Sequence, residues 1–347
     1  MRKMASIRKI NAINPIENAD AIECATVGGW KVVVKKGEFK IGDLAVYCEI
    51  DSWIPNQVAP FLTKGAEPRE YNGVKGERLR TMKLRGQISQ GLLLSVVQTG
   101  DQYCMVKSVD GCYVEAQEGD DVSEALGIQK WEMEIPTQLA GLVKGNFPTI
   151  IPKTDQERVQ NIVIEIAEAQ GKFFEVTEKL EGSSMTCYWL NEEFGVCTRN
   201  LDLKRDEKNS LWLTAIREGI EDKIKILGKK NIALQGELVG PGVQGNIYKL
   251  PKLEFFIFDI YDADEGRYLN PIERASLVKE MGLRHVPIVD ANFKLDCDVD
   301  GLIAKADGKS VIGNNVTPLR EGLVFKEVSG EMSFKAISNK YLLGQSN

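Results

Sequence analysis

The sequence predicts an α+β protein of two domains, a small β-barrel followed by a strand-rich domain with a few helices. The 347 residues exceed what one hydrophobic core usually encloses, since domains commonly hold roughly 100–200 residues. Short β-branched runs between glycines dominate the first third of the chain, and capped helices occur only later. With 43% hydrophobic and 27% charged residues, the chain is neither disordered nor collagen-like.

The first domain, residues 1–135, is predicted to be a small barrel or sandwich. Three runs of β-branched or alternating residues bounded by turn signals occur at 28–37, 42–50 and 87–96. Few helical patterns interrupt them, which favours short strands packed around one core.

A basic segment at 75–85 lies between these runs, with five cations and one acid in eleven residues. The cations are Lys75, Arg78, Arg80, Lys83 and Arg85. Within the pairs 78/80 and 83/85 the spacing of two places side chains on one face of a strand or loop. Two interpretations stay open, a solvated barrel edge or a surface that follows nucleic-acid phosphates.

Residues 136–153, rich in proline and glycine, are predicted to be a linker with a strand fragment, and 154–347 to be the second domain. Thr154 and Glu157 have the spacing of a capping box, which predicts a helix from there to Gly171. Asn270-Pro271, with Glu273 at the third position, predicts another helix that ends at Gly282. Seven strands are predicted around these helices: 173–179, 184–190, 194–199, 232–239, 253–261, 321–327 and 332–337.

Composition excludes several classes of function. No apolar run approaches the roughly 18 residues of a membrane span, so no membrane partner is expected. The seven cysteines are odd in number and never form a CxxC pair, which favours reduced thiols in the cytoplasm over a zinc site. The single histidine, His285, makes a Ser-His-Asp relay improbable and is interpreted as structural. The net charge of −6 leaves room only for a local basic patch.

Charged residues at the edges of apolar strands are the candidates for chemistry. Lys179 ends one strand, and Gly182 follows three residues later in a serine-flanked turn. This KxxG pattern alone is weak, because a lysine in a surface turn is the commoner explanation. Its companions are Arg199 in a TRN sequence, Glu237 in an apolar strand, the pair Phe256 and Phe258 on one strand face, Glu321, Lys326 and Lys335.

The order of these motifs resembles the covalent nucleotidyltransferase superfamily of polynucleotide ligases and mRNA capping enzymes. The motifs read KxxG, (T/S)RN, GEL, FxFD, EGxVxK and FKxxSxKY along the chain. Residues 150–345 are most similar to ATP-dependent RNA ligases that seal nicked duplexes, in the branch with an N-terminal OB-like domain. The segments 152–161 and 236–246 match this branch as well. The resemblance implies an OB-like β-barrel followed by an ATP-grasp-like nucleotidyltransferase domain of antiparallel sheets with flanking helices.

The resemblance also implies the reaction and its catalytic residues. The amine of Lys179 would attack the α-phosphate of ATP and form lysyl-AMP. The AMP would pass to an RNA 5′-phosphate, which a 3′-hydroxyl then attacks. The amine must lose its proton first, so its pKa has to fall from about 10.4, through burial and through Lys335 and a metal ion. Glu237 and Glu321 complete the expected catalytic set.

Further residues are implied to bind the nucleotide and a metal. Arg199 would hold a phosphate or the ribose, Glu237 the ribose hydroxyls, and Phe258 or Phe256 the adenine ring, with Glu178 near its edge. Lys326 and Lys335 would also face the nucleotide. Glu181 and Glu321 would hold the waters of Mg²⁺ or Mn²⁺.

Two positions depart from the pattern of the family. Glu181 stands where the family usually has aspartate, so the carboxylate has a longer arm. Ile337 stands where related nick-sealing ligases carry a second lysine, and Lys326 or Lys340 is the candidate substitute.

The expected partner is RNA with 3′-hydroxyl and 5′-phosphate ends in a nicked duplex, bound by a monomer. In an OB-like domain, the five cations of the basic segment become candidates for gripping RNA phosphates, and residues 84–95 are also similar to a tRNA-binding OB module. DNA ligase and capping guanylyltransferase are the enzymatic alternatives, although their OB domain typically follows the core. A degenerate RNA-binding module is the other alternative.

Overall fold

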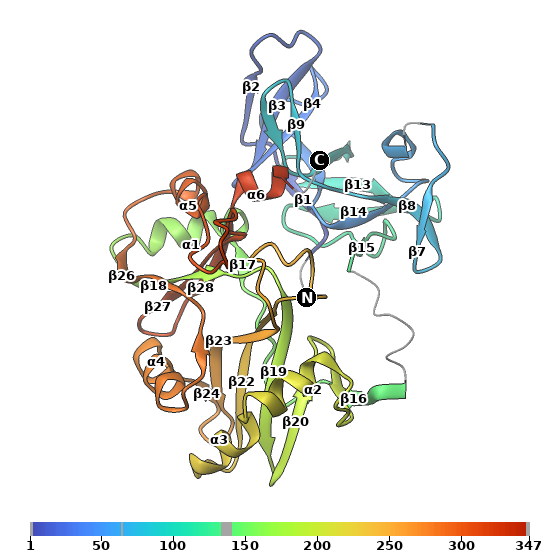
Figure 1. Ribbon diagram of the computed structural model, residues 1–347. Coiled ribbons are helices and arrows are strands. Elements are labelled where there is room, and N and C mark those ends of the chain that lie inside the picture. Colours follow the sequence, from blue (N-terminus) through green and yellow to red (C-terminus); the bar gives the residue numbers. More distant parts are fainter. Residues whose placement is uncertain (1–2, 64, 133–140, 345–347) are drawn as a thin grey trace. The chain divides into compact units, whose positions relative to one another are not determined.

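The computed structural model describes residues 3–63, 65–132 and 141–344, and the chain forms two compact units (Figure 1). Unit 1 comprises Met1–Glu134, Gln160–Val163 and Leu342–Asn347, and unit 2 comprises Ile135–Val159 and Ile164–Tyr341. The predicted linker falls partly outside the described residues. Of its described part, Val143–Asn146 forms β16, a strand of unit 2.

Unit 1 consists of short, mostly antiparallel strands. One sheet has the order β1-β5-β11, with β1 (Ala5–Lys9), β5 (Leu44–Cys48) and β11 (Leu92–Ser95). A meander joins β2 (Ala12–Pro15), β3 (Ile22–Val27) and β4 (Trp30–Lys35). Another sheet has the order β15-β6-β8-β7, with β6 (Ser52–Pro55), β7 (Arg69–Tyr71), β8 (Val74–Arg78) and β15 (Gln129–Lys130). The rest are β9 (Met82–Leu84) with β10 (Gln87–Ser89), and β12 (Val97–Gln98), β13 (Tyr103–Lys107) and β14 (Tyr113–Gln117).

The core of unit 1 follows the alternation that the sequence shows. In β4, Trp30, Val32 and Val34 are buried, whereas the lysines between and after them reach solvent to different degrees. The β5 strand is buried on both faces because it lies between β1 and β11 and its two faces contribute to different hydrophobic clusters. A short 3-10 helix, Pro60–Thr63, is the one helical element among the described residues between positions 3 and 132.

Unit 2 is built on two sheets. The larger has the order β16-β21-β20-β19-β22-β23-β24, with β25 added to β23. Its strands after β16 are β19 (Ser183–Leu190), β20 (Glu193–Cys197), β21 (Leu201–Leu203), β22 (Ile232–Val239), β23 (Glu254–Asp262), β24 (Arg267–Tyr268) and β25 (Arg284–His285). The smaller has the order β17-β28-β27-β18-β26, with β17 (Glu157–Arg158), β18 (Phe173–Lys179), β26 (Ile288–Lys294), β27 (Gly322–Glu327) and β28 (Ser333–Ile337). All seven strands predicted for this region are confirmed to within one or two residues at each end.

The helices of unit 2 confirm one prediction and correct another. They are α1 (Val163–Glu168), α2 (Ser210–Arg217), α3 (Ile220–Ile226), α4 (Pro271–Glu280) and α5 (Val299–Ala306), whereas α6 (Asn339–Gly344) and a 3-10 turn at Val159–Asn161 belong partly to unit 1. The predicted capping box at Asn270 and Glu273 is present in α4. The capping box predicted at Thr154 is wrong. Glu157 and Arg158 instead pair in parallel with β28, so the chain is extended there and the helix begins only at Val163.

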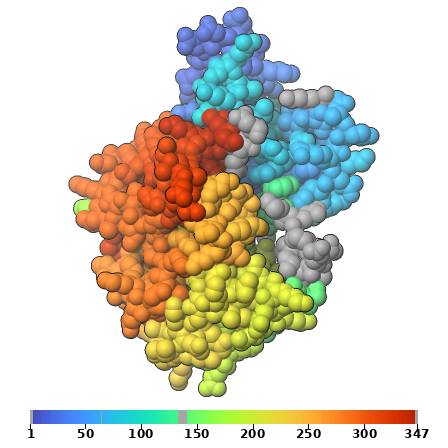
Figure 2. All heavy atoms as spheres, in the orientation of Figure 1, coloured from blue at the N-terminus to red at the C-terminus, as the bar shows by residue number. Residues whose placement is uncertain are grey.

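Segments of unit 2 on either side of residue 250 pack against each other. Yellow and orange segments lie in contact in the space-filling view (Figure 2), as the pairing of β22 with β23 requires. None of the helices among the described residues combines the length and apolar character that a membrane crossing requires.

Candidate active site

The site in unit 2 begins where β18 ends beside the start of β27. Lys179 is in register with Gly322, so the residue before Gly322 lies next to the lysine side chain. The Nζ atom of Lys179 donates to Oε1 of Glu321 over 2.6 Å. Gly322 is needed here, because an added Cβ would lie 2.3 Å from the carbonyl oxygen of Ala336 on β28. The close packing of these strands therefore fixes the lysine–glutamate pair.

Two further carboxylates belong to this group. Glu237 lies on β22 and Glu181 in the turn after β18, and both interact electrostatically with Lys179 and Glu321. Burial and the nearby Glu321 carboxylate raise the pKa of Glu237 to about 8, although Lys179 and Arg199 oppose this. Burial and Glu321 likewise raise the pKa of Glu181. Three carboxylates therefore share one lysine in a partly buried space.

The pKa of Lys179 moves opposite to the direction that nucleophilic attack requires. Burial lowers the pKa of Lys179, but the carboxylates of Glu321 and Glu237 together outweigh burial and raise it above the ordinary value of a lysine. Arg158 on β17 acts in the lowering direction. The amine is thus protonated in the chain alone, and its activation depends on what binds beside it.

Glu181, the departure from the family pattern, is held by two tyrosines. Its backbone N–H donates to the hydroxyl of Tyr248 over 2.7 Å. The hydroxyl of Tyr341 forms a hydrogen bond with its carboxylate. Tyr248 is fully buried and Tyr341 nearly so, so both are fixed by packing. The longer arm therefore has a defined position. Tyr341 ends the FKxxSxKY motif but was not predicted as a site residue, and no motif pointed to Tyr248.

A second part of the site contains cations from separate elements. The guanidinium of Arg199, after β20, donates to Oδ2 of Asp155 over 2.8 Å. The amine of Lys335 on β28 donates to Oδ1 of the same carboxylate over 3.2 Å. The buried Arg158 pairs in register with Lys335. Asp155 and Arg158 lie in the segment 152–161, which resembles the family, but neither was predicted as a site residue.

The aromatic part of the site depends on a β-bulge. The pairing of β22 with β23 shifts between Gln235 and Gly236, which leaves Phe258 as the extra residue. Its carbonyl oxygen accepts a hydrogen bond from Nζ of Lys326 over 2.7 Å. Phe256 is buried and Phe258 half-buried in the same cluster, so the two share a face as predicted.

Lys326 is tied to the strand that carries Phe258. Besides the carbonyl of Phe258, its amine contacts Oδ1 of Asp259 over 2.6 Å. Burial lowers the pKa of Lys326, with Asp259 opposing. Arg274, on α4, contacts Asp259 and Glu175 from within the core, so Lys326 is part of a buried ionic network.

Glu178 and Lys340 lie apart from the lysine–glutamate pair. Glu178 is buried and accepts a hydrogen bond from the backbone N–H of Val311 over 3.2 Å, and burial raises its pKa. Ile312, in the same loop, packs against the aromatic cluster. The exposed Lys340 interacts with Asp307 at 3.6 Å, and the buried Ile337 pairs with Gly322. Lys340 therefore contacts Asp307 in this structure, and its role as a substitute for the second lysine stays a prediction.

The carboxylates fit a hydrated divalent cation. Among the described residues, no group of three His, Cys, Asp or Glu side chains is close enough to ligate a metal directly. Burial nonetheless raises the pKa values of Glu237 and Glu181, and the Glu321 carboxylate adds to the rise in both. Mg²⁺ and Mn²⁺ take hard oxygen ligands, and Mg²⁺ usually keeps several waters that carboxylates can hold.

The basic segment of unit 1 divides into one paired cation and four exposed ones. The guanidinium of Arg78 contacts Asp51 at 2.6 Å and stacks 3.8 Å from the centre of the Trp131 ring. The exposed cations are Lys75, Arg80, Lys83 and Arg85. Arg85 has a φ of 49° in the two-residue turn between β9 and β10, so it sits at the tip of a hairpin.

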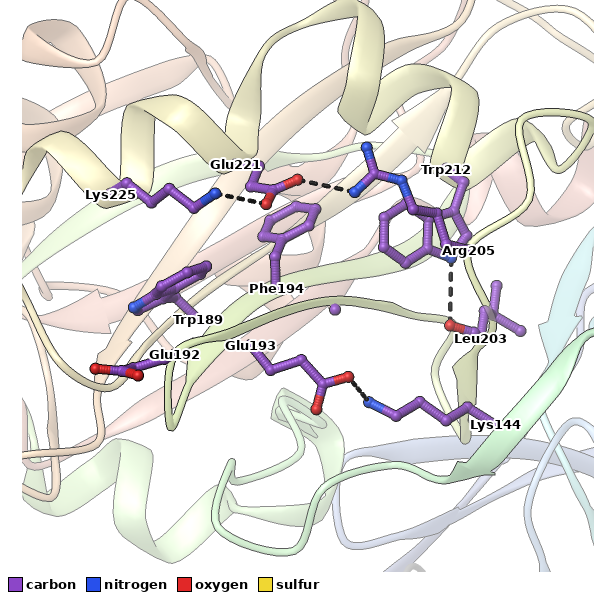
Figure 3. A pocket seen from close by; sticks show the side chains of 11 residues that line it. Lys144, Trp189, Glu192, Glu193, Phe194, Leu203, Arg205, Trp212, Glu221 and Lys225 are labelled. Atoms are coloured by element: carbon purple, nitrogen blue, oxygen red, sulfur yellow. Dashed lines mark hydrogen bonds and ion pairs between the residues drawn. The ribbon is translucent and has the colours of Figure 1, made fainter.

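A separate hollow of about 350 Å³ lies in unit 2 along β19, β20 and the helices α2 and α3 (Figure 3). Its cations are all engaged. Lys144 contacts Glu193 at 2.6 Å, and Arg205 and Lys225 both contact Glu221. Lys179 does not line this hollow, which is therefore distinct from the group of carboxylates.

Both parts of the chain are similar to proteins that are already known. The sequence model of the RNA ligase family matches residues 172–341, and that of an OB-fold domain matches 4–96. A Naegleria gruberi RNA ligase mutant solved with AMP and Mn is 47% identical, with a TM-score of 0.87 over 98% of each chain. The same ligase solved with PPi is 48% identical, with a TM-score of 0.87 over 99% of this chain and 98% of that one. A mutant of it solved with ATP and Mn is 47% identical, with a TM-score of 0.86 over 98% of each chain. No relative was found among curated proteins. The predicted α+β fold with an N-terminal OB domain is thereby confirmed.

Proposed function

The chain belongs to the RNA ligase family, and we propose from this premise that it is an ATP-dependent ligase that seals RNA nicks through lysyl-AMP on Lys179. The observation that carries the proposal is the group formed by Lys179, Glu321 and Glu237 in unit 2. An amine reachable from solvent and surrounded by carboxylates suits transfer of a nucleotide to that amine in the presence of a divalent cation.

In the first step, Nζ of Lys179 attacks the α-phosphorus of ATP and pyrophosphate leaves. Arg199 and Lys335, which both contact the carboxylate of Asp155, would neutralise phosphate charge. Phe258 would stack on adenine, with Glu178 near its edge and Lys326 fixing the bulge that presents the ring. The AMP then passes to an RNA 5′-phosphate, and a 3′-hydroxyl attacks to close the phosphodiester and release AMP.

Activation of the Lys179 amine requires that the negative charge of Glu321 and Glu237, which raises its pKa, be neutralised. A bound Mg²⁺ or Mn²⁺, its waters held by Glu321, Glu237 and Glu181, would supply positive charge that neutralises these carboxylates and the phosphates. Glu321 would then no longer hold the proton on Lys179, and Arg158 and Lys335 would add to the lowering of the pKa of the amine. Glu237 is assigned here to the metal waters as well as to the ribose, because it lies beside Lys179.

Residues 1–135 would bind the RNA duplex. The exposed Lys75, Arg80, Lys83 and Arg85 are the cations proposed to contact RNA phosphates. Arg78 is proposed to stabilise the domain instead, through its contacts with Asp51 and the Trp131 ring.

The proposal is tested by incubation with α-labelled ATP and Mg²⁺ or Mn²⁺. We expect an acid-labile AMP adduct that is absent in Lys179→Ala. The adduct should be present in Lys340→Ala, a control that removes an exposed lysine in contact with Asp307. An adduct with GTP or NAD but none with ATP would support a capping-type or NAD-dependent enzyme instead.

The substrate is tested with nicked duplexes in which each strand is RNA or DNA. We expect nicks in RNA to be sealed and nicks in all-DNA duplexes to be sealed more slowly, and the mixed duplexes show which strand must be RNA. Equal sealing of an all-DNA nick would favour a DNA ligase.

A further inference from the structure

Asp155 bridges the two cations to which the proposed function assigns the phosphates of ATP. One carboxylate oxygen contacts Arg199 at 2.8 Å and the other contacts Lys335 at 3.2 Å. The two cations come from positions 136 residues apart, 199 and 335, and the single acid joins them. Two oxygens of one anion, each on a different cation, is also the arrangement in which a phosphate group binds.

The backbone of Lys335 lies in a strand and that of Arg199 in a closed turn, whereas Asp155 lies in a segment without regular structure. Lys335 lies within β28, in register with Val324 on one side and Arg158 on the other. Arg199 lies in a turn closed by the backbone hydrogen bond from Thr198 to Leu201, 2.9 Å long. Asp155 precedes β17 in a segment without regular structure, and 36% of its side chain is exposed. Both side chains of the Arg199–Asp155 pair are partly exposed, 44% and 36%, so this contact can open to an incoming anion while the backbone of Lys335 stays in β28.

We propose that Asp155 is an internal anion that occupies Arg199 and Lys335 until the phosphates of ATP displace it, and that it thereby limits the affinity of the site for phosphate. This inference rests on the proposed function, which places the phosphates on these two cations. Ion pairs that are partly exposed contribute little each, so the displacement costs only a modest part of the binding free energy of ATP. The same competition promotes release of pyrophosphate after lysyl-AMP has formed.

The test is isothermal titration of the full chain and of Asp155→Asn with ATP, pyrophosphate and adenosine. Asparagine keeps the shape and removes the charge. We expect the Kd of ATP and of pyrophosphate to fall about three- to tenfold, the size expected for losing two partly exposed competing ion pairs. The Kd of adenosine, which has no phosphate, should stay unchanged. Glu193→Gln is the matched control, because it removes a carboxylate of unit 2 that pairs with Lys144 in the separate hollow.

An unchanged or higher Kd of ATP in Asp155→Asn would overturn the inference, and so would an equal fall for adenosine. Asp155→Ala provides a second variant in case the amide adopts new hydrogen bonds. Lys335→Ala separates this inference from the proposed function. If Lys335→Ala leaves both the Kd of ATP and adduct formation unchanged, the phosphate role of Lys335 fails. If Lys335→Ala weakens ATP and Asp155→Asn does not strengthen it, only the role of Asp155 fails.

Discussion

The Nζ atom of Lys179 lies 2.6 Å from Oε1 of Glu321, although the two residues are 142 positions apart in the sequence. The pairing of β18 with β27 brings them together, and the ion pair holds the proposed nucleophile in its unreactive, protonated form. A site that protects its amine in this way can couple reactivity to the arrival of a cation and nucleotide.

Replacement of Glu321 by glutamine should therefore lower the pKa of Lys179. Glu321 and Glu237 raise that pKa against the effect of burial, so removal of one carboxylate lets burial act more strongly. Because the free amine is the reactive form, the midpoint of its reaction with an amine-directed acylating reagent should move to lower pH. The measurement is made without metal or nucleotide, with Lys179 modification quantified by mass spectrometry across pH.

Glu193→Gln is the control for this experiment, since its carboxylate pairs with Lys144 in the separate hollow. It should leave the Lys179 midpoint where it is. In the unmodified chain, added Mn²⁺ should shift the midpoint in the same direction as Glu321→Gln. A midpoint that stays fixed in Glu321→Gln would show that the ion pair does not control the amine.

Phe256 and Phe258 should respond differently to replacement by alanine. Phe258 is half-buried at the bulge, and loss of its proposed stacking on adenine should raise the Kd of ATP about tenfold or more with little change in Tm. Phe256 is buried in the core, so Phe256→Ala should lower the free energy of unfolding by about 3–5 kcal/mol. ATP titration and denaturant unfolding of both variants make the comparison. The opposite result would assign the adenine contact to Phe256.

The basic segment should separate into a stabilising cation and RNA-binding cations. Arg78→Ala should lower the Tm, because it removes the contact with Asp51 and the stacking on Trp131. A variant with Arg80, Lys83 and Arg85 all changed to glutamate should keep its Tm and its AMP adduct, yet bind nicked RNA more weakly, most clearly at low salt. Filter binding at several salt concentrations and thermal unfolding provide the readouts. If adduct formation falls together with RNA binding, the segment is a folding element.

Local patterns predicted the strands of unit 2, whereas the helix that they predicted from Thr154 is wrong. A capping box is a local signal, and here the pairing of Glu157 and Arg158 with β28 overrides it. The partner strand β28 lies about 180 residues further along the sequence, so the residues near Thr154 give no indication of this pairing. The same distance explains why Asp155 and Arg158 were missing from the predicted site. The bulge at Phe258 was equally hidden, because it depends on the register of β22 against β23.

The sequence by itself determined the two-domain α+β fold and the strands of unit 2, and its resemblance to a family supplied the candidate lysine, carboxylate and aromatic residues. Strand periodicity can be recognised within a few residues, and the order of the motifs can be followed along the chain, so neither requires knowledge of the folded structure. The tertiary structure decided which charges meet: Lys179 with Glu321, Arg199 and Lys335 with Asp155, Glu181 with two tyrosines. Electrostatic interactions depend on distance and burial, so even the direction of the pKa shift of Lys179 followed only from the packed strands.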